Sequence, residues 1–296
     1  MPLNTHHSLP YAIDAHHHYW WLGKRKHRWP AGVGDRLNKS FTPHDLIPQM
    51  EMAKVNGCIL MQSLNDYDET VEFLELASQN SHLLGVVGWL PLESQALTLK
   101  YLETIPHREL LIGVRHLINF EPDPKWLLRP EVMDSIGVIE DQNLVFDVVP
   151  VNEEQFNSVL AVANRFPNLS IVLDHLARPP IDRRDPVSWH KKIQMAAQLP
   201  NVSIKLSVGL DILMDWKWSI QDIQEFADKT IHLFGVDRVM AASNWPICNL
   251  AANYSELWSG VRALIKDHQL IDQTKILSEN AKKIFSFNKL PIVNSI

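Results

Sequence analysis

The sequence predicts an α/β fold in the form of a single (β/α)₈ TIM barrel. Eight short apolar runs follow one another along the chain, and longer segments of helical periodicity separate them. The apolar runs lack clean alternation, as expected of parallel strands that are buried on both faces. The length of 296 residues suits such a barrel with extensions, and no linker interrupts the pattern, so we expect one domain over residues 1–296.

The expected strands come in a regular series. They are Tyr11–Ala15, Gly57–Gln62, Leu84–Trp89, Leu111–Arg115, Asn143–Val148, Ser170–Asp174, Val202–Leu206 and Arg238–Ala242. Between them we expect helices at Asp68–Gln79, Asn152–Arg165, Val187–Leu199 and Ile220–Phe234. Another helix should begin with Thr42 as its N-cap and Pro43 at its first position. The tail from Tyr254 onward reads as helical and should pack outside the barrel.

Composition excludes several classes of protein. A net charge of −6 argues against a nucleic-acid-binding protein, which would carry a basic stripe. No apolar run approaches the length of a membrane span, and Met1–Pro10 lacks the layout of a secretory signal. Cys58 and Cys248 fit buried free thiols, so we expect a soluble, cytoplasmic protein. The basic run Lys24–Arg28 either contacts a substrate or partner or forms a solvated loop.

Polar, titratable or aromatic side chains follow nearly every expected strand. In a barrel of this kind the reacting groups lie at the carboxyl ends of the strands, where such residues converge. We therefore expect a site there, and its candidate members are His16, His18, Gln62, Trp89, Arg115, His116, Asp147, His175, Arg178, Lys205, Asn244 and Trp245.

His16 and His18 are the strongest candidates for metal ligands. Residues two apart at a strand end point the same way, and neutral imidazole is a common donor to zinc. The alternative is a polar loop or packing cluster, and His17 should point away from the site. His175 would be a third ligand, or would polarise a substrate carbonyl, or would be a buried histidine tied to backbone.

The remaining candidates suit substrate binding. Arg115 and Arg178 could clamp a carboxylate through the planar fork of the guanidinium group. Lys205 would hold a substrate oxygen or form a structural ion pair. The aromatic residues Trp20, Trp21 and Trp29 would form a wall over the pocket or belong to the core.

At this point several segments carry a family likeness that spans nearly the whole chain. They are IDAHHHYWW at Ile13, QSLNDYDETVEFL at Gln62, VVGWLPL at Val86, IGVRH at Ile112, VFDVVP at Val145, VLDHLARP at Val172, NVSIKLS at Asn201 and DRVMAASNWPICNL at Asp237. The chain resembles the amidohydrolase-related barrel family that contains the pyrone dicarboxylate lactonases and sugar-acid lactonases such as L-fuconolactonase and L-rhamnonolactonase. The resemblance is closer to the sugar-lactone branch, and it implies hydrolysis of a small lactone.

The resemblance also implies a site built from His16, His18 and His175. Members of the family bind one divalent ion, often zinc, or work without any metal. This chain has Asp147 at the fifth strand end and no Lys at the fourth, so a two-metal site is not expected. A small-molecule lactone is the expected partner, whereas the sequence leaves open whether the chain acts alone or as a homodimer.

Asn244 departs from the family pattern. Many relatives have Asp at this position, where it activates the attacking water, and an amide cannot accept that proton. Asn244 would be an introduced substitution, or a natural residue with the base supplied by metal-bound hydroxide or His175, or a sign that catalysis is lost. The corresponding alternatives are a catalytically impaired sugar-acid binding protein and a metal-dependent non-oxidative decarboxylase, although decarboxylases of this type generally keep the carboxylate.

Overall fold

The structure is a computed structural model that describes residues 11–29, 33–181, 185–209 and 219–287. Met1–Pro10, for which no secretory signal was expected, lies outside the described residues. Among the residues that are described, no helix is long and apolar enough to cross a membrane. Cys58 and Cys248 are free and buried, as predicted.

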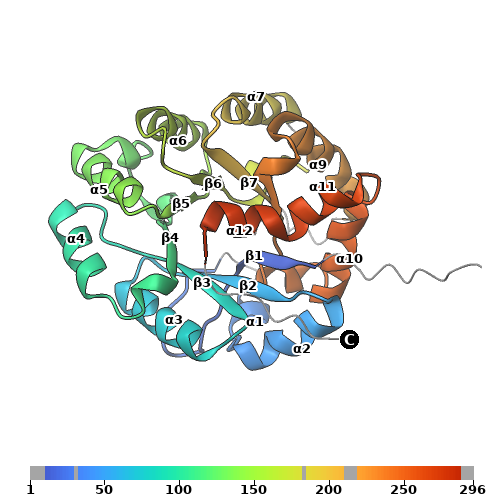
Figure 1. Cartoon of the computed structure of the whole chain (residues 1–296), viewed down its shortest axis with the longest axis horizontal. Helices are drawn as coiled ribbons and strands as arrows, with labels where there is room; N and C mark the ends of the chain where they lie inside the picture. The colour runs from blue at the N-terminus through green and yellow to red at the C-terminus, as the bar shows by residue number, and fades with distance from the viewer. Residues whose placement is uncertain (1–10, 30–32, 182–184, 210–218, 288–296) are drawn as a thin grey trace, which may run out of the picture.

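Eight parallel strands pair in sequence order and form a nearly closed barrel (Figure 1). The predicted barrel is therefore confirmed, and two strands have the predicted bounds. The strands are β1 Ile13–His17, β2 Gly57–Met61, β3 Leu83–Gly88, β4 Leu111–Arg115, β5 Val145–Val148, β6 Ile171–Leu173, β7 Val202–Leu206 and β8 Val239–Ala241.

Helices alternate with these strands and surround the barrel (Figure 1). Those of the described residues up to β8 are α1 Gly34–Leu37, α2 Pro43–Ala53, α3 Tyr67–Gln79, α4 Gln95–Thr104, α5 Pro130–Asp141, α6 Glu153–Arg165, α7 Pro186–Ala197 and α9 Ile220–Phe234. Thr42 is the N-cap of α2, as predicted, and it also forms a capping box with Asp45. The helices α4 and α5 were not predicted.

The seam between β8 and β1 closes through the segment that follows β8. The backbone N–H of His18 donates to the carbonyl of Trp245 over 2.7 Å, and that of Asn244 donates to the carbonyl of His16 over 2.8 Å. The buried Asp14 carboxylate adds a second link, because it accepts hydrogen bonds from the backbone and hydroxyl of Ser243 and from the Tyr254 hydroxyl. The seam thus fixes Asn244 beside the histidines of β1.

A bulge in β1 decides where its histidines point. The pairing register of β1 with β2 shifts between Asp14 and His17, so one extra residue lies in β1. Ile13 and Ala15 pack in the barrel interior with Met61 and Val87. After the bulge, His16 and His18 point to the same centre, whereas His17 packs against Tyr19 with ring centroids 4.7 Å apart.

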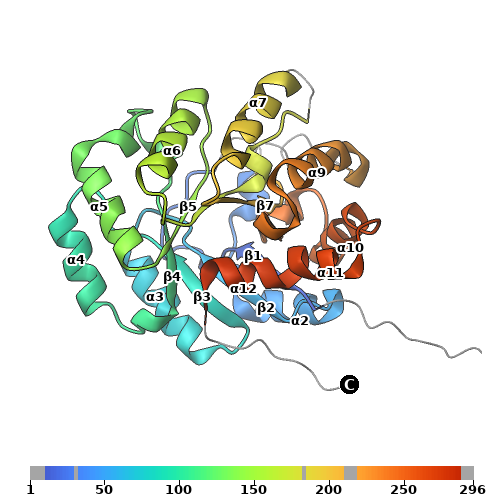
Figure 2. The same ribbon diagram turned by 45° about the horizontal axis from the view of Figure 1, so that its top comes forward.

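The expectation that the tail packs outside the barrel is wrong for its last helix. The tail forms α10 Tyr254–Leu264, α11 Leu270–Thr274, a π-helical turn Lys275–Glu279 and α12 Asn280–Phe285. Figures 1 and 2 show α12 lying across one end of the barrel. Ala281, Phe285 and Phe287 are buried there and pack on the apolar residues of the barrel interior. Burial of these apolar side chains against the interior of the barrel stabilises α12 in this position.

Candidate functional site

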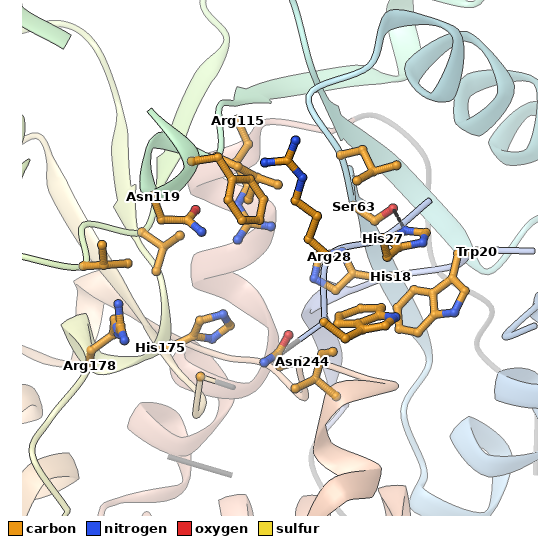
Figure 3. Close-up of a pocket in the computed structure, with 18 residues that line it drawn as sticks. His18, Trp20, His27, Arg28, Ser63, Arg115, Asn119, His175, Arg178 and Asn244 are labelled. Atoms are coloured by element: carbon orange, nitrogen blue, oxygen red, sulfur yellow. Dashed lines mark hydrogen bonds between the residues drawn. The ribbon is translucent and has the colours of Figure 1, made fainter. Parts of the chain in front are cut away.

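A cavity of about 300 Å³ opens at the carboxyl ends of the strands (Figure 3). Such a volume suits a small organic molecule. His18, Arg115, His175, Arg178 and Asn244 line it, and all five were predicted to belong to the site. The structure therefore brings together residues from four separate strand ends, those of β1, β4, β6 and β8.

His16 and His18 face each other at the bottom of this site. Their Nε2 atoms lie 3.0 Å apart. Nδ1 of His18 donates to the carbonyl of Met61 over 3.1 Å, so its Nε2 carries a lone pair. Nδ1 of His16 lies 3.1 Å from Asp174 Oδ1 and 3.1 Å from Lys205 Nζ. Burial lowers the pKa of both imidazoles well below the usual value, so both are neutral.

His175 and Asn244 complete the floor of the cavity. Nδ1 of His175 lies 2.8 Å from the hydroxyl of Ser207, which sets the orientation of the ring. The Nδ2 group of Asn244 donates to the carbonyl of Val208 over 2.9 Å, so Oδ1 is the atom that can accept a hydrogen bond from a ligand. A carboxylate in the same orientation would place an oxygen against the Val208 carbonyl. The local structure therefore accommodates the amide.

Two buried cations and two buried carboxylates lie directly below the floor of the cavity. Lys205 Nζ lies 2.5 Å from Asp147 and 3.0 Å from Asp174. Arg115 lies 3.7 Å from Asp147 and 3.3 Å from Asp174. Burial raises the pKa of Asp174, but the charges of Lys205 and Arg115 and the hydrogen bond with His16 outweigh it and hold this pKa well below the usual range. Burial and the nearby Asp174 charge raise the pKa of Asp147. The four groups are electrically balanced when all are ionised.

The donor set fits one divalent metal ion. When Nδ1 of His16 donates to Asp174, both facing Nε2 atoms present lone pairs, which repel each other unless a cation or proton lies between them. Two nitrogen ligands of one tetrahedral zinc ion are about 3.4 Å apart, close to the observed 3.0 Å. The contacts of Nδ1 with a carboxylate and a carbonyl are the supports that metal-binding histidines usually have.

His175 is the third histidine of this set. Its ring centroid lies 4.7 Å from that of His16. Ligand atoms of His16, Asp174 and His175 also lie within 4.8 Å of one another. Asp174, however, is already in contact with Lys205 and Arg115, so His16, His18 and His175 suit an ion better.

One wall of the cavity was only partly anticipated from the sequence. Trp20, His27, Arg28 and Trp29 line it, so part of the basic run and two of the three tryptophans lie at the cavity. His27 stacks on Trp29 with ring centroids 5.3 Å apart and an interplanar angle of 9°. Trp21 is not among the residues that line this cavity.

A hydrogen-bond chain holds His27. The buried Glu69 carboxylate accepts from the hydroxyl and the backbone N–H of Ser63, and Ser63 Oγ lies 2.8 Å from His27 Nε2 (Figure 3). When Glu69 is ionised, the Ser63 proton points to it, so Ser63 accepts from His27 Nε2 and Nδ1 of His27 is an acceptor. Burial lowers the pKa of His27 to about 4, so the ring is neutral. Ser63 directly follows the predicted strand end Gln62, but no local pattern linked it to His27.

The other predicted residues lie outside the cavity lining. His16, Gln62, Asp147 and Lys205 are fully buried at strand ends. Trp89 donates to Nδ1 of His116 over 3.0 Å, and His116 stacks on Trp126 with ring centroids 4.0 Å apart. Trp245 is fully buried against Tyr19 and Phe41. These last three, Trp89, His116 and Trp245, support the site through packing.

The barrel and its histidine-lined floor define a class of protein: the enzymes that act on small molecules at the carboxyl face of a TIM barrel. The sequence profile of the family described as Amidohydrolase matches residues 13–287, and the chain belongs to this family.

Among known proteins, the chain is similar to two L-fucono-1,5-lactonases. That of Burkholderia multivorans is 31% identical, with 83% of this chain and 86% of the relative covered. That of Burkholderia ambifaria is 29% identical, with 84% of each chain covered. A solved amidohydrolase structure from Burkholderia multivorans with bound zinc superposes with a TM-score of 0.86 at 27% identity, and the match covers 94% of this chain and 99% of that one.

Proposed function

We propose that this protein hydrolyses a small lactone of a sugar acid or related hydroxy acid. The observation that carries the proposal is a group of three imidazoles, with His18 and His175 at the floor of a small-molecule cavity and His16 buried against His18, each with Nδ1 in contact with a separate polar group. The names of the two Burkholderia relatives support the reaction type.

His16, His18 and His175 would hold one divalent ion, zinc in this proposal. An ion there supplies a Lewis acid for the ester carbonyl and lowers the pKa of a water molecule. Asp174 and the Met61 carbonyl orient the two imidazoles of β1 toward it.

Other residues of the cavity have the remaining roles in hydrolysis. Asn244 Oδ1 orients the attacking water, and Arg115, which lines the cavity, stabilises negative charge that develops on the carbonyl oxygen. Water adds to the carbonyl carbon, the ring C–O bond breaks, and the leaving oxygen takes a proton. The product is a hydroxy acid, which releases one proton at neutral pH. Trp20 and Trp29 cover the apolar face of the ring and exclude water from that side.

The first experiment measures proton release from a panel of sugar-acid lactones by the native chain and by Asn244→Asp, each with and without zinc. We expect the native chain to hydrolyse at least one lactone, because its amide fits the Val208 carbonyl. Turnover by Asn244→Asp alone would show that the native chain is a disabled form. If neither protein hydrolyses any lactone of the panel, the result would favour the alternatives, a non-oxidative decarboxylase or a sugar-acid binding protein.

Metal use needs a separate measurement. Calorimetry of zinc binding to the native chain and to His18→Ala tests the ligand set without reference to activity. We expect one site in the native chain, weakened about 100-fold or more when one of three ligands is lost. Lys26→Ala, which alters an exposed side chain outside the cavity lining, is the control. Unchanged zinc affinity in His18→Ala would contradict the proposed ligand set.

A further inference from the structure

The two oxygens of the Glu69 carboxyl group have different neighbours. Oε2 accepts from the backbone N–H groups of Ser63 and Leu64 over 2.7 Å and 3.0 Å. Oε1 lies 2.5 Å from the hydroxyl oxygen of Ser63. Because Oε2 faces two groups that can only donate, a proton on this carboxyl group fits only on Oε1, where it points at Ser63. Glu69 therefore accepts from the Ser63 hydroxyl when it is ionised and donates to it when it is protonated.

The Ser63 hydroxyl transmits the state of Glu69 to His27. Ser63 Oγ lies 2.8 Å from Nε2 of His27. The imidazole stays neutral because burial lowers its pKa to about 4, and a neutral imidazole has one N–H and one lone pair. When Glu69 is ionised, Nε2 carries the proton and donates to Ser63. When Glu69 is protonated, Ser63 donates to Nε2, and the imidazole proton lies on Nδ1.

Glu69 changes its protonation state in the neutral range. The residue is 1% exposed, and this burial raises its pKa to about 7 although the hydrogen bonds from Ser63 and Leu64 oppose the shift. Both states of the Glu69–Ser63–His27 chain are therefore populated near neutral pH, within a range where the His27 ring itself does not titrate.

The charged groups around Glu69 are paired with other carboxylates. The titratable side chains near it are Lys24, Arg25 and His27 from the loop after β1, and Asp66 and Glu72 from α3 and its N-cap. Glu72 pairs with Lys24 over 2.6 Å and with Arg25 over 2.7 Å, and Arg25 also lies 3.6 Å from Asp66. Arg25 lowers the pKa of Glu69, but the effect of burial is larger. Both cations thus have partners other than Glu69.

The hydrogen-bonding state of His27 matters because the cavity lining is rich in donors. Ser63 and His27 lie together on the cavity wall (Figure 3). Arg28 and Arg115 also line the cavity, and guanidinium groups can only donate. A substrate hydroxyl that accepts from an arginine still has its own proton to donate. Nδ1 of His27 accepts that proton when it carries a lone pair, and it repels the hydroxyl proton when it is an N–H.

We propose that Glu69 and Ser63 are positioning residues that decide whether His27 accepts from a substrate hydroxyl or donates to the substrate, according to the protonation state of Glu69. This role deepens the proposed lactonase function and, for substrate binding, rests on it. The change takes up one proton. A solvent proton binds at Nδ1 of His27, the Nε2 proton moves to Ser63, and the Ser63 proton moves to Oε1 of Glu69.

Nitrogen-15 NMR of histidine-labelled protein measures the tautomer directly, because protonated and unprotonated ring nitrogens differ in chemical shift. Loss of a signal in His27→Gln identifies the residue. In the native chain, the proton should move from Nε2 to Nδ1 between about pH 8 and about pH 6. Glu69→Gln should keep it on Nδ1 throughout, since the amide oxygen takes the backbone N–H groups and the NH₂ group donates to Ser63.

Two further variants show whether the contact between Glu69 and His27 runs through Ser63. Ser63→Ala removes the connecting hydroxyl and should make the His27 tautomer independent of pH. Asp68→Asn removes an exposed carboxylate one position earlier on α3 and should keep the native pH dependence. A single His27 tautomer in the native chain across this range would overturn the proposal. Native pH dependence in Glu69→Gln or Ser63→Ala would overturn it as well.

Steady-state kinetics with a hydrolysed lactone connects the tautomer to substrate binding. The KM of the native chain should rise about 3-fold to 10-fold from about pH 8 to about pH 6, as for loss of one hydrogen bond. Glu69→Gln should have the KM of the native low-pH form at both pH values. Native pH dependence of KM in Glu69→Gln would overturn the role of His27 in binding. Absence of all lactone turnover would count against the proposed function, while NMR would still decide the tautomer.

Discussion

The tautomer of His27 is decided by two neighbours that lie far from it in sequence. Above its pKa of about 7, Glu69 is ionised and fixes the proton of Ser63, and Ser63 then accepts from His27 Nε2. Nδ1 of a neutral His27 is thereby an acceptor on the cavity wall, suited to a hydroxyl group of a sugar-acid ring. A hydrogen bond from a ligand hydroxyl to His27 would therefore depend on a proton position that neither the identity nor the burial of His27 specifies.

Ser63→Ala should raise KM about 3-fold to 10-fold with little change in kcat, as expected for one hydrogen bond made equally in the ground and transition states. Steady-state kinetics with a hydrolysed lactone checks this. Ser78→Ala, which removes an exposed hydroxyl that bonds only to the backbone of α3, serves as the control. A Ser63→Ala variant with native KM would mean that the tautomer of His27 does not matter.

Glu69 gives the chain a pH-dependent stability of known sign. Burial raises its pKa from 4.5 to about 7 in the folded state. Its contribution is therefore fully present below the unfolded pKa and is lost as pH rises through about 7. Relative to Glu69→Gln, the native chain should lose no more than about 3 kcal/mol of stability between about pH 5 and pH 8.

Urea unfolding across this pH range measures the difference between the two proteins. Glu154→Gln, an exposed substitution on α6, should follow the native pH dependence. A native chain that gains stability relative to Glu69→Gln as pH rises would show instead that the folded state favours the ionised form.

At the scale of elements, the bulge in β1 and the position of α12 shape the site, and hydrophobic periodicity in the sequence reveals neither. The bulge in β1 changes which side chains face the centre, so that Ala15 packs in the interior and His16 and His18 both reach the site. The helix α12 covers the other end, where Phe285 lies beneath Lys205 with 5.7 Å between Nζ and the ring centroid. One element therefore supports the buried ion network from below.

Phe285→Ala should lower the free energy of unfolding by about 3–5 kcal/mol, because it leaves a cavity in the barrel interior. Leu270→Ala, at a side chain that is 58% exposed, should change it by about 0.5 kcal/mol at most. Urea unfolding of both variants provides the comparison. A loss below about 1 kcal/mol in Phe285→Ala would contradict the role of α12 as a cover for the barrel.

At the scale of the whole molecule, the ion network joins β4, β5, β6 and β7 across the barrel. Arg115 and Lys205 balance Asp147 and Asp174, and all four are buried. Removal of one member leaves an uncompensated charge in a region of low dielectric, which costs more than the pair itself contributes. The network therefore fixes the relative positions of four strand ends under the site.

Lys205→Met should destabilise the chain by about 3–5 kcal/mol, and adding Asp147→Asn should recover part of this loss by removing the charge left without a partner. Urea unfolding of the single and double variants measures the coupling. Lys229→Met breaks an exposed pair with Glu225 and should cost about 1 kcal/mol at most. Additive losses in the double variant would mean that the two groups do not share one network.

The sequence by itself determined the barrel, because buried parallel strands and amphipathic helices leave periodic patterns that can be read locally. It also determined the line of strand-end residues, including His16, His18, Arg115, His175 and Asn244, because the fold places every strand end at one face. Local pattern could not separate residues that line the cavity from those that pack behind it, such as His116 and Trp245. That separation, the contact between Ser63 and His27, and the position of α12 depend on which segments meet across the barrel. Only the tertiary structure decides them, since the interactions join residues far apart in the chain.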